Sequence, residues 1–184
     1  MNHLETLTAE WLSYNGYFTR TAVKVGKRDK GGWDGELDVI GFHPDPDRRH
    51  FLHIECSTDA WTWAKREETF QRKFRIGRKH ALEYFQGMAS PDELKNVDQV
   101  VVHGFAGATD KHRKLGGGRL VRVQELVAEI MNGIPPQLSI SAVPENYPLM
   151  RTLQLSVMAG AKVASPKLCL IPIIDDKGIT ATVL

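Results

Sequence analysis

The sequence predicts one α/β domain, in which an amphipathic helix leads into a three-stranded meander and a second helix leads into a fourth strand. Three observations predict this order: apolar residues at helical spacing near the N-terminus, strand-like runs separated by glycine- and proline-rich turns, and a later continuous apolar run of strand length. A chain of 184 residues, 42% hydrophobic and 25% charged, can bury a core without disulfides. We therefore expect a single domain over 1–184, with a core over 3–105 and a C-terminal extension over 106–184.

The first half is predicted as a helix followed by a meander. Apolar side chains recur at helical spacing over residues 3–15, and Asn15-Gly16 supplies a stop that accepts positive φ. Residues 17–25 are rich in aromatic and β-branched side chains, which predicts a strand, and residues 26–35 are predicted as a mobile, charged, glycine-rich loop. Two further strands, separated by a turn with two prolines, are expected at 36–42 and 51–57.

The second half is predicted as a helix, a strand and a mainly helical extension. A helix over about 60–85 keeps a helical period of apolar residues and should pack across the sheet, and an apolar strand at 97–105 follows it. These elements together predict a mixed central sheet flanked by helices. The remaining segments are expected to be a flexible basic loop at 107–119 with a hinge-like or disordered GGG at 116–118, helices at 120–131 and 149–161, and a terminal hairpin at 168–184.

Composition argues against several classes of protein. Only Cys56 and Cys169 are present, and no Cys/His cluster has zinc-site spacing, which favours a reducing, cytoplasmic location. The N-terminus lacks the basic and apolar regions of a signal peptide. No stretch reaches the roughly 18 apolar residues of a membrane span, so no membrane partner is expected.

Charge draws attention to one helix rather than to the whole chain. The formal net charge is only +2, too small to indicate a nucleic-acid-binding protein by itself. Seven lysines and arginines nevertheless lie between residues 65 and 79. This pattern fits a helix that faces phosphates, and it also fits a solvated helix face with pairs such as Glu68 and Arg72. The candidate DNA contacts are Arg66, Arg72, Lys73, Arg75, Arg78 and Lys79.

Two acidic residues on neighbouring strands are the candidate centre of the chemistry. Strand alternation puts Asp38 on the face of Ile40, and it puts Glu55 on one face with His53 and Ser57. Carboxylates are depleted in strands and costly to bury without a partner, which distinguishes this pair from ordinary surface charge. Such a pair offers hard oxygen ligands to Mg²⁺ or Mn²⁺, ions that can activate water and neutralise phosphate charge.

Several neighbouring side chains have both a functional and a structural interpretation. His53 could shuttle a proton or contact a phosphate, or it could be satisfied within its strand. Trp33, Trp61 and Trp63 could stack on unpaired bases, or they could anchor the core and the loops. The side chain of Cys56 should point to the opposite, core-facing side and act as a small apolar residue.

This pattern resembles the PD-(D/E)XK nuclease superfamily, and within it the restriction-endonuclease-like and Holliday-junction-resolvase-like members. The resemblance covers residues 3–105, and it rests on Glu5 in the first helix, Gly16-Tyr17, GELDVIGF at 35–42 and HIECS at 53–57. It implies a restriction-endonuclease-like α-β-β-β-α-β core, DNA as a partner and a homodimer. It also implies that metal ions are held or oriented by Glu5, Asp38, Glu55 and the backbone carbonyl of Cys56.

One position departs from the family pattern. The family's lysine, two residues after the third-strand acid, would occupy position 57, where this chain has Ser57. A lysine there would hold the attacking water or stabilise developing negative charge, and a neutral hydroxyl supplies no fixed positive charge. Some members carry this lysine on a neighbouring element. A helix that returns antiparallel from about Ala60 favours Lys65, with Lys73 as the second candidate.

Two hypotheses from different classes follow. The first is a Mg²⁺- or Mn²⁺-dependent DNA endonuclease that hydrolyses phosphodiester bonds, with catalytic residues Glu5, Asp38, Glu55 and either Lys65 or Lys73. The alternative is a DNA-binding or assembly module that kept the nuclease fold and lost catalysis when position 57 became serine. A small-molecule metalloenzyme ranks last, because the chain has no histidine-rich ligand set. A lysine amine pointing into the acid cluster would favour the first hypothesis.

Overall fold

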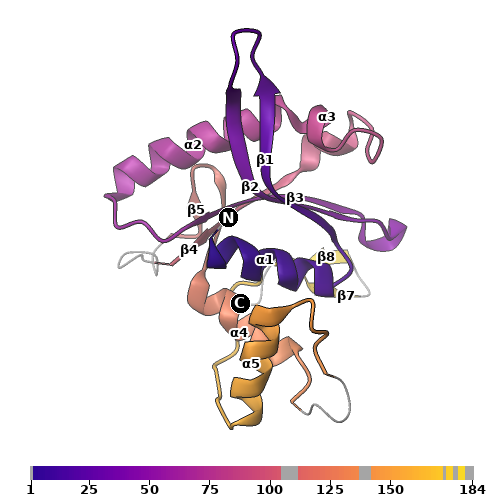
Figure 1. Ribbon diagram of the computed structural model, residues 1–184, viewed down its shortest axis with the longest axis vertical. Coiled ribbons are helices and arrows are strands. Elements are labelled where there is room, and N and C mark those ends of the chain that lie inside the picture. Colours follow the sequence, from indigo (N-terminus) through magenta and orange to yellow (C-terminus); the bar gives the residue numbers. More distant parts are fainter. Residues whose placement is uncertain (1, 105–111, 137–141, 172, 176–177, 181–184) are drawn as a thin grey trace.

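A six-stranded mixed sheet forms the centre of the protein, with helices on both of its faces (Figure 1). The computed structural model describes residues 2–104, 112–136, 142–171, 173–175 and 178–180. In the order β1-β2-β3-β4-β6-β5, the strands are β1 (Phe18–Lys27), β2 (Trp33–His43), β3 (His50–Ser57), β4 (Asp98–His103), β6 (Gly118–Arg122) and β5 (Lys114–Leu115). β1 to β3 form an antiparallel meander, β3, β4 and β6 are parallel, and β5 is antiparallel to β6. The expected α/β class, with a mixed sheet flanked by helices, is confirmed.

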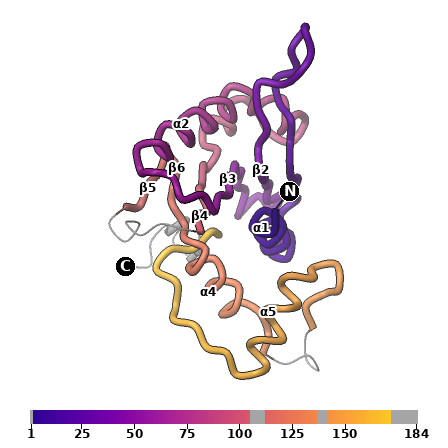
Figure 2. The backbone as a smooth tube through the Cα atoms, turned by 60° about the vertical axis from the view of Figure 1, so that its left-hand side comes forward, coloured from indigo at the N-terminus to yellow at the C-terminus, as the bar shows by residue number. Residues whose placement is uncertain are grey.

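Helices α1 (His3–Tyr14) and α2 (Trp63–Lys79) lie on opposite sides of this sheet (Figures 1 and 2). The other helices are α3 (Ala81–Tyr84), α4 (Val123–Gly133) and α5 (Pro148–Met158), with short 3₁₀ turns at Pro46–Arg48 and Glu93–Asn96. α1 begins at Asn2, whose side chain and Glu5 cap the first turn reciprocally, satisfying amides that have no partner inside the helix. Among the described residues, no helix is long and apolar enough to cross a membrane.

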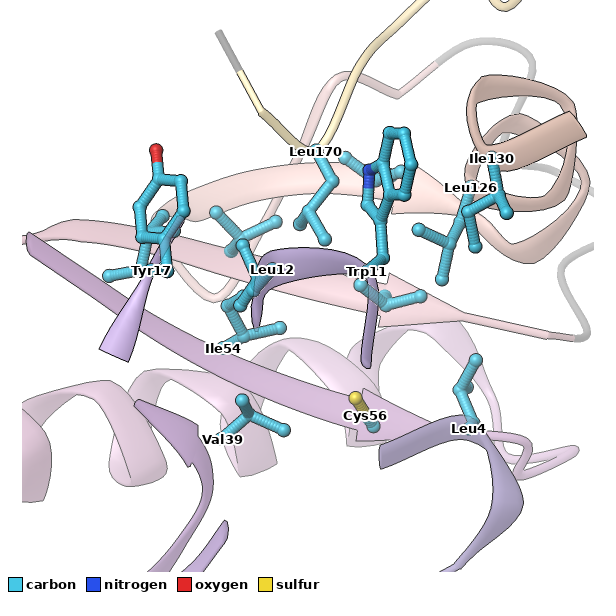
Figure 3. Close-up of a cluster of buried hydrophobic side chains, with 14 of the residues drawn as sticks. Leu4, Trp11, Leu12, Tyr17, Val39, Ile54, Cys56, Leu126, Ile130 and Leu170 are labelled. Atoms are coloured by element: carbon cyan, nitrogen blue, oxygen red, sulfur yellow. The ribbon is translucent and has the colours of Figure 1, made fainter. Parts of the chain in front are cut away.

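Alternation along β3 sends its side chains into separate cores. Ile54 and Cys56 belong to a cluster against α1, whose centre is shown in Figure 3. His53 and Glu55 lie on the other face, where the ring of Phe74 from α2 packs edge-on to His53 with ring centroids 5.3 Å apart. Cys56 is therefore core-facing, as the sequence predicted, and the two polar residues are directed toward α2.

The segment 26–35 is not the mobile loop that the sequence predicted. β1 and β2 remain paired out to Lys27 and Trp33, so that only residues 28–32 turn, and the two strands form an arm that projects from the body (Figures 1 and 2). Gly31 and Gly32 have positive φ angles of 88° and 82°, which the turn requires. These glycines close a two-stranded ribbon rather than loosening a loop.

The segment 112–122 is also more ordered than predicted. β5 and β6 form a hairpin around Gly116-Gly117, where a flexible loop and the start of a helix at Leu120 were expected. A Cβ added at Gly118 would lie 2.4 Å from Phe74, so the glycine lets the hairpin lie directly against α2. Because β6 pairs with β4 up to Arg122, α4 begins at Val123 and not at Leu120. Residues 107–111 of the expected loop lie outside the described residues.

The single helix expected over about 60–85 is two helices. α2 ends at Lys79, and His80 separates it from α3. The ring of His80 lies 2.9 Å from a carboxylate oxygen of Asp34 and 3.0 Å from one of Glu83, so contacts with β2 and with α3 hold it at the break. Tertiary contacts, which apolar periodicity does not reveal, thus end α2.

The expected C-terminal helix and hairpin are found, and the helix is fastened to the core through Glu10. Glu10 of α1 accepts hydrogen bonds from the amides of Leu149 and Met150, each at 3.0 Å, and so caps the start of α5. β7 (Ile173–Asp175) and β8 (Gly178–Thr180) pair as an antiparallel hairpin. The extension is therefore anchored to the first helix of the chain.

Glu129 of α4 makes a second link between the extension and the core. Its Oε1 accepts from the indole nitrogen of Trp11 at 2.8 Å and from the amide of Ile171 at 3.1 Å. The amide of Leu170 donates to the other oxygen. One buried carboxylate thus joins α1, α4 and the segment after α5.

We expect Glu129→Ala to lower the free energy of unfolding by about 2–3 kcal/mol, because three donors would lose their acceptor. Glu145→Ala, at an exposed position, is the matched control and should change it by less than about 0.5 kcal/mol. Urea denaturation followed by circular dichroism measures both. Equal stabilities of the two variants would show that Glu129 does not fasten the extension.

Candidate active site

The candidate site lies where β2 and β3 part. Their pairing ends at Val39 and Ile54, and the register continued by one residue would set Asp38 opposite Glu55. The amide of Cys56 instead donates to a carboxylate oxygen of Asp38 at 2.8 Å. Because this side chain satisfies an amide that would otherwise need a strand partner, β2 is free to leave the sheet.

Lys73 of α2 joins the two carboxylates. Its ammonium nitrogen lies 3.3 Å from both carboxylate oxygens of Asp38 and also contacts Oε2 of Glu55. The side chain of Glu55 is fully buried, whereas those of Asp38 and Lys73 are 13% and 27% exposed. The cluster therefore meets solvent at Asp38 and Lys73, with Glu55 behind them.

Burial and mutual repulsion set the charges of this cluster. Burial and the charge of Glu55 raise the pKa of Asp38 to about 7, against the opposing charge of Lys73. Burial also acts to raise the pKa of Glu55, but its contacts with His53 and Lys73 outweigh this, and the pKa lies below its usual value. Burial acts to lower the pKa of Lys73, but the two carboxylates outweigh it and raise that pKa. Lys73 therefore stays charged at neutral pH, while Asp38 titrates there.

His53 holds Glu55 from inside the protein. Its Nε2 lies 2.7 Å from Oε1 of Glu55, and both side chains are fully buried. Gly77 of α2 makes room for the imidazole, because an added Cβ would lie 2.3 Å from the ring. His53 is thus a partner of the proposed ligand Glu55 and does not face solvent. An isolated glycine within a helical pattern is the sequence signal that could have revealed this close approach.

The structure corrects the choice between the two lysines. Lys65 is exposed and lies 3.2 Å from Glu68 on its own helix, so the expectation that it reaches the acids was wrong. Lys73 reaches them because the stripe of α2 that faces the sheet follows a spacing of four, three and four residues through Arg66, Phe70, Lys73 and Gly77. Lys65 lies beside this stripe. The apolar pattern around Phe70 and Phe74 already contained this information.

Ser57 does not take part in the acid cluster. Its hydroxyl donates to Asp59, whose carboxylate also accepts from Nε of Arg66 at 2.9 Å. Nε2 of His103 lies 3.3 Å from the same carboxylate. These contacts fasten the first turn of α2 to the ends of β3 and β4, and sequence reasoning missed this network. They also make Arg66 a buried structural residue, which corrects its prediction as a DNA contact.

The remaining predicted ligands lie near the same end of β3. Glu5 caps α1, with Oε1 2.7 Å from the side-chain nitrogen of Asn2. Burial raises the pKa of the Cys56 thiol, and the charges of Asp38, Glu55 and Glu5 raise it further, so Glu5 is within electrostatic range of Cys56. The carbonyl of Cys56 faces the same gap as its amide, because both groups of a strand residue point to the same side. Ligation by Glu5 and by this carbonyl stays a prediction.

The other predicted DNA contacts lie on the second half of α2. Arg72 and Arg75 are exposed on either side of Lys73. Lys79 lies 2.6 Å from Asp34 of the arm, and Arg78 donates to Gln99. The tryptophans differ from one another, since Trp33 and Trp61 are exposed and Trp63 stacks on His112 with ring centroids 4.0 Å apart. Trp33 and Trp61 therefore do not pack in the core, and loop anchoring or base stacking by these two rings stays a prediction.

The acid pair fits a small hard cation. Among the described residues, no group of three or more His, Cys, Asp and Glu side chains is arranged to hold a metal ion. Mg²⁺ needs less than this, because it keeps several waters and takes one or two carboxylates together with substrate oxygens. The charge of Glu55 adds to burial in raising the pKa of Asp38, and a cation between the two carboxylates would counter that repulsion.

Comparison of the chain with protein-family models, with curated proteins and with solved structures gave no match. The chemistry of the site is therefore inferred from the contacts, burial and charges of its own residues. Those features are two carboxylates on diverging strands, a lysine that contacts both, and a buried histidine behind them.

The raised pKa of Asp38 makes stability depend on pH. The folded state holds this proton up to about pH 7, whereas the unfolded chain releases it near the ordinary aspartate pKa of 3.8, so ionising Asp38 lowers stability as pH rises through this window. Asp38→Asn removes that loss. In EDTA, the stability of the variant relative to wild type should rise by at least about 1 kcal/mol between pH 4.5 and pH 8. Urea denaturation at both pH values tests this, and a difference that stays constant or shrinks contradicts it.

Proposed function

We propose that this protein is a divalent-metal-dependent DNA endonuclease of the PD-(D/E)XK type, with a restriction-endonuclease-like core. The contact of Lys73 with both Asp38 and Glu55 carries the proposal, because α2 then supplies the positive charge that Ser57 lacks. The α-β-β-β-α-β order of the elements, with only short helical turns inserted, supports it as well.

The protein orients each carboxylate from behind. The Cys56 amide fixes one oxygen of Asp38, and His53 fixes one oxygen of Glu55. Lys73 contacts both oxygens of Asp38 and the other oxygen of Glu55. Asp38 and Glu55 would hold Mg²⁺ or Mn²⁺, and such an ion activates water and neutralises phosphate charge when bound. Groups held before the reaction need little rearrangement during it, which favours catalysis.

Lys73 has the positive charge and the side-chain mobility that phosphodiester hydrolysis requires. In the reaction a water oxygen bonds to phosphorus, one ester P–O bond breaks, and the leaving oxygen receives a proton. The ammonium of Lys73 would hold the attacking water or stabilise the charge that develops on the phosphate. Its flexible stem and partial exposure let it move from the carboxylates toward substrate.

A second candidate is a DNA-binding or assembly module without catalysis. The contact of Lys73 with Asp38 and Glu55 also fits a permanent structural ion pair, because the charge of Lys73 neutralises one of the two carboxylate charges. A structural pair of this kind would hold α2 on the sheet and would need no metal. Cleavage measurements distinguish the two candidates.

We expect Lys73→Met to slow nicking of supercoiled plasmid by about 10²-fold or more at similar DNA affinity, because a charge that stabilises the transition state is lost. Lys65→Met is the matched control on the same helix and should cut as wild type does, since Lys65 is exposed and paired with Glu68. Single-turnover nicking in Mg²⁺ and in Mn²⁺ measures both variants. Thermal unfolding establishes that each variant is folded.

The outcomes separate the two candidates. Asp38→Asn should abolish nicking if the carboxylate holds the metal. If wild type and Asp38→Asn are equally inert while wild type binds DNA, the protein is a module without catalysis. If wild type cuts and Lys73→Met cuts equally well, Lys73 has only a structural role.

DNA binding should weaken steeply with salt, because phosphate contacts release counterions. Arg72→Ala/Arg75→Ala removes the two exposed charges beside Lys73 and should reduce the slope of log K against log salt by about 2. Lys162→Ala/Lys167→Ala removes two exposed charges from the extension and serves as control. Fluorescence anisotropy in Ca²⁺ measures both, and an unchanged slope for the first variant would remove α2 from the interface.

A further inference from the structure

The arm consists of residues 23–37, the part of β1 and β2 beyond Asp38 and the turn that joins them. It is a paired ribbon from Val23 and Leu37 out to Lys27 and Trp33. Its base is packed in the core through Val23, Val25 and Leu37, and only its outer end projects from the body (Figures 1 and 2). Asp38 and Trp33 are five residues apart on one strand, which corresponds to about 16 Å. The arm therefore begins at the acid cluster and ends well away from it.

The arm is held at a fixed angle to α2. Asp34 lies 3.0 Å from Arg28 of the turn, 2.6 Å from Lys79 and 2.9 Å from His80. On the other strand, the amide of Gly26 donates to Glu83 at 3.1 Å. The helix that carries Lys73 thus also positions the arm. A substrate bound by the arm would therefore have a fixed position relative to the acid cluster.

The tip combines cations with an exposed aromatic ring. Lys27, Arg28, Lys30 and Trp33 are all exposed. Lys27 is the register partner of Trp33, so the two side chains share one face of the ribbon. A Cβ added at Gly31 or Gly32 would meet no atom within 4 Å, so the space beside these two glycines is open. The tip is free to be inserted into a partner.

The dimensions and chemistry of the arm match the major groove of DNA. That groove is about 12 Å wide and about 8.5 Å deep, and it admits a two-stranded ribbon. With Asp38 and Lys73 at a backbone phosphate, a reach of about 16 Å brings the tip to base edges, where lysine and arginine are suitable donors. A single strand has no such groove. Exposed lysines also make a protein partner less favourable, because lysine is depleted from protein interfaces.

We infer that the arm inserts into the major groove of duplex DNA beside the bond to be cut. The inference rests on the proposed function and adds that the substrate is a duplex held by its groove. α2 contacts the backbone with Arg72 and Arg75, while Lys27, Lys30 and Trp33 contact the groove. Binding to duplex should therefore depend on the arm, and binding to a single strand should not.

The test uses the full chain with Lys27→Ala/Lys30→Ala/Trp33→Ala. Lys162→Ala/Lys167→Ala/Phe18→Ala is the matched control, which removes two exposed lysines and one exposed aromatic ring elsewhere. Fluorescence anisotropy in Ca²⁺ compares a 30-base-pair duplex with a single strand of the same length, the probe size being about three helical turns. We expect the arm variant to bind the duplex at least about tenfold more weakly and to bind the single strand within about threefold of wild type. The control should match wild type on both.

Guanine methylation gives an independent readout. Methylation at N7, which lies in the major groove, should interfere with binding of wild type and not with residual binding of the arm variant. Equal losses on duplex and single strand would overturn the inference, because the arm would then be a general electrostatic contact. A change in oligomeric state of the variant, measured by light scattering, would make the arm a protein-docking element and also overturn it.

The proposed function can fail separately. If wild type binds and cuts DNA while the arm variant binds duplex as wild type does, the groove assignment is wrong and the nuclease proposal stands. If wild type neither binds nor cuts any DNA, the nuclease proposal is wrong, and the arm inference fails with it. Circular dichroism and thermal unfolding of both variants exclude a folding defect as the cause of lost binding.

Discussion

The hydrogen bond from the Cys56 amide to the Asp38 carboxylate is the interaction on which the site and the arm both depend. A strand that leaves a sheet exposes backbone groups that need new partners. Here the side chain of Asp38 in β2 supplies one, so the part of β2 that precedes Val39 can separate from β3. The same separation directs the Asp38 carboxylate toward Glu55 and sends the rest of the hairpin outward as the arm.

Each charged group of the acid cluster would be unfavourable to bury without the others. A buried Glu55 without a partner would be costly, and a second carboxylate beside it adds repulsion. His53 and Lys73 each satisfy one oxygen of Glu55, and Lys73 also contacts Asp38. Burial and the remaining repulsion from Glu55 together raise the pKa of Asp38. Such a cluster is suited to receive a cation, because one more positive charge relieves that repulsion.

α2 couples three parts of the molecule through one rigid element. Its first turn is fastened to the end of β3 by Arg66 and Asp59, and its middle carries Lys73 into the acid cluster. Its last residues, Lys79 and the adjoining His80, bind Asp34 of the arm. A shift of α2 along its axis would therefore disturb the strand end, the lysine and the arm together. These contacts explain how Lys73, although it lies on a helix, keeps a fixed position relative to the strands that carry Asp38 and Glu55.

The sequence by itself determined the α/β class, the order of the main elements and the strand faces on which Asp38 and Glu55 lie, because strand alternation and helical periodicity are local properties. It also contained the stripe of Arg66, Phe70, Lys73 and Gly77, whose spacing identifies the inward lysine. Only the tertiary structure decided that Lys65 faces solvent, that Arg66 is buried against Asp59, and that the glycine-rich segment 26–35 is a paired arm. Those outcomes depend on contacts between residues far apart in the chain, and local patterns carry no information about which distant group will satisfy a charge or an amide.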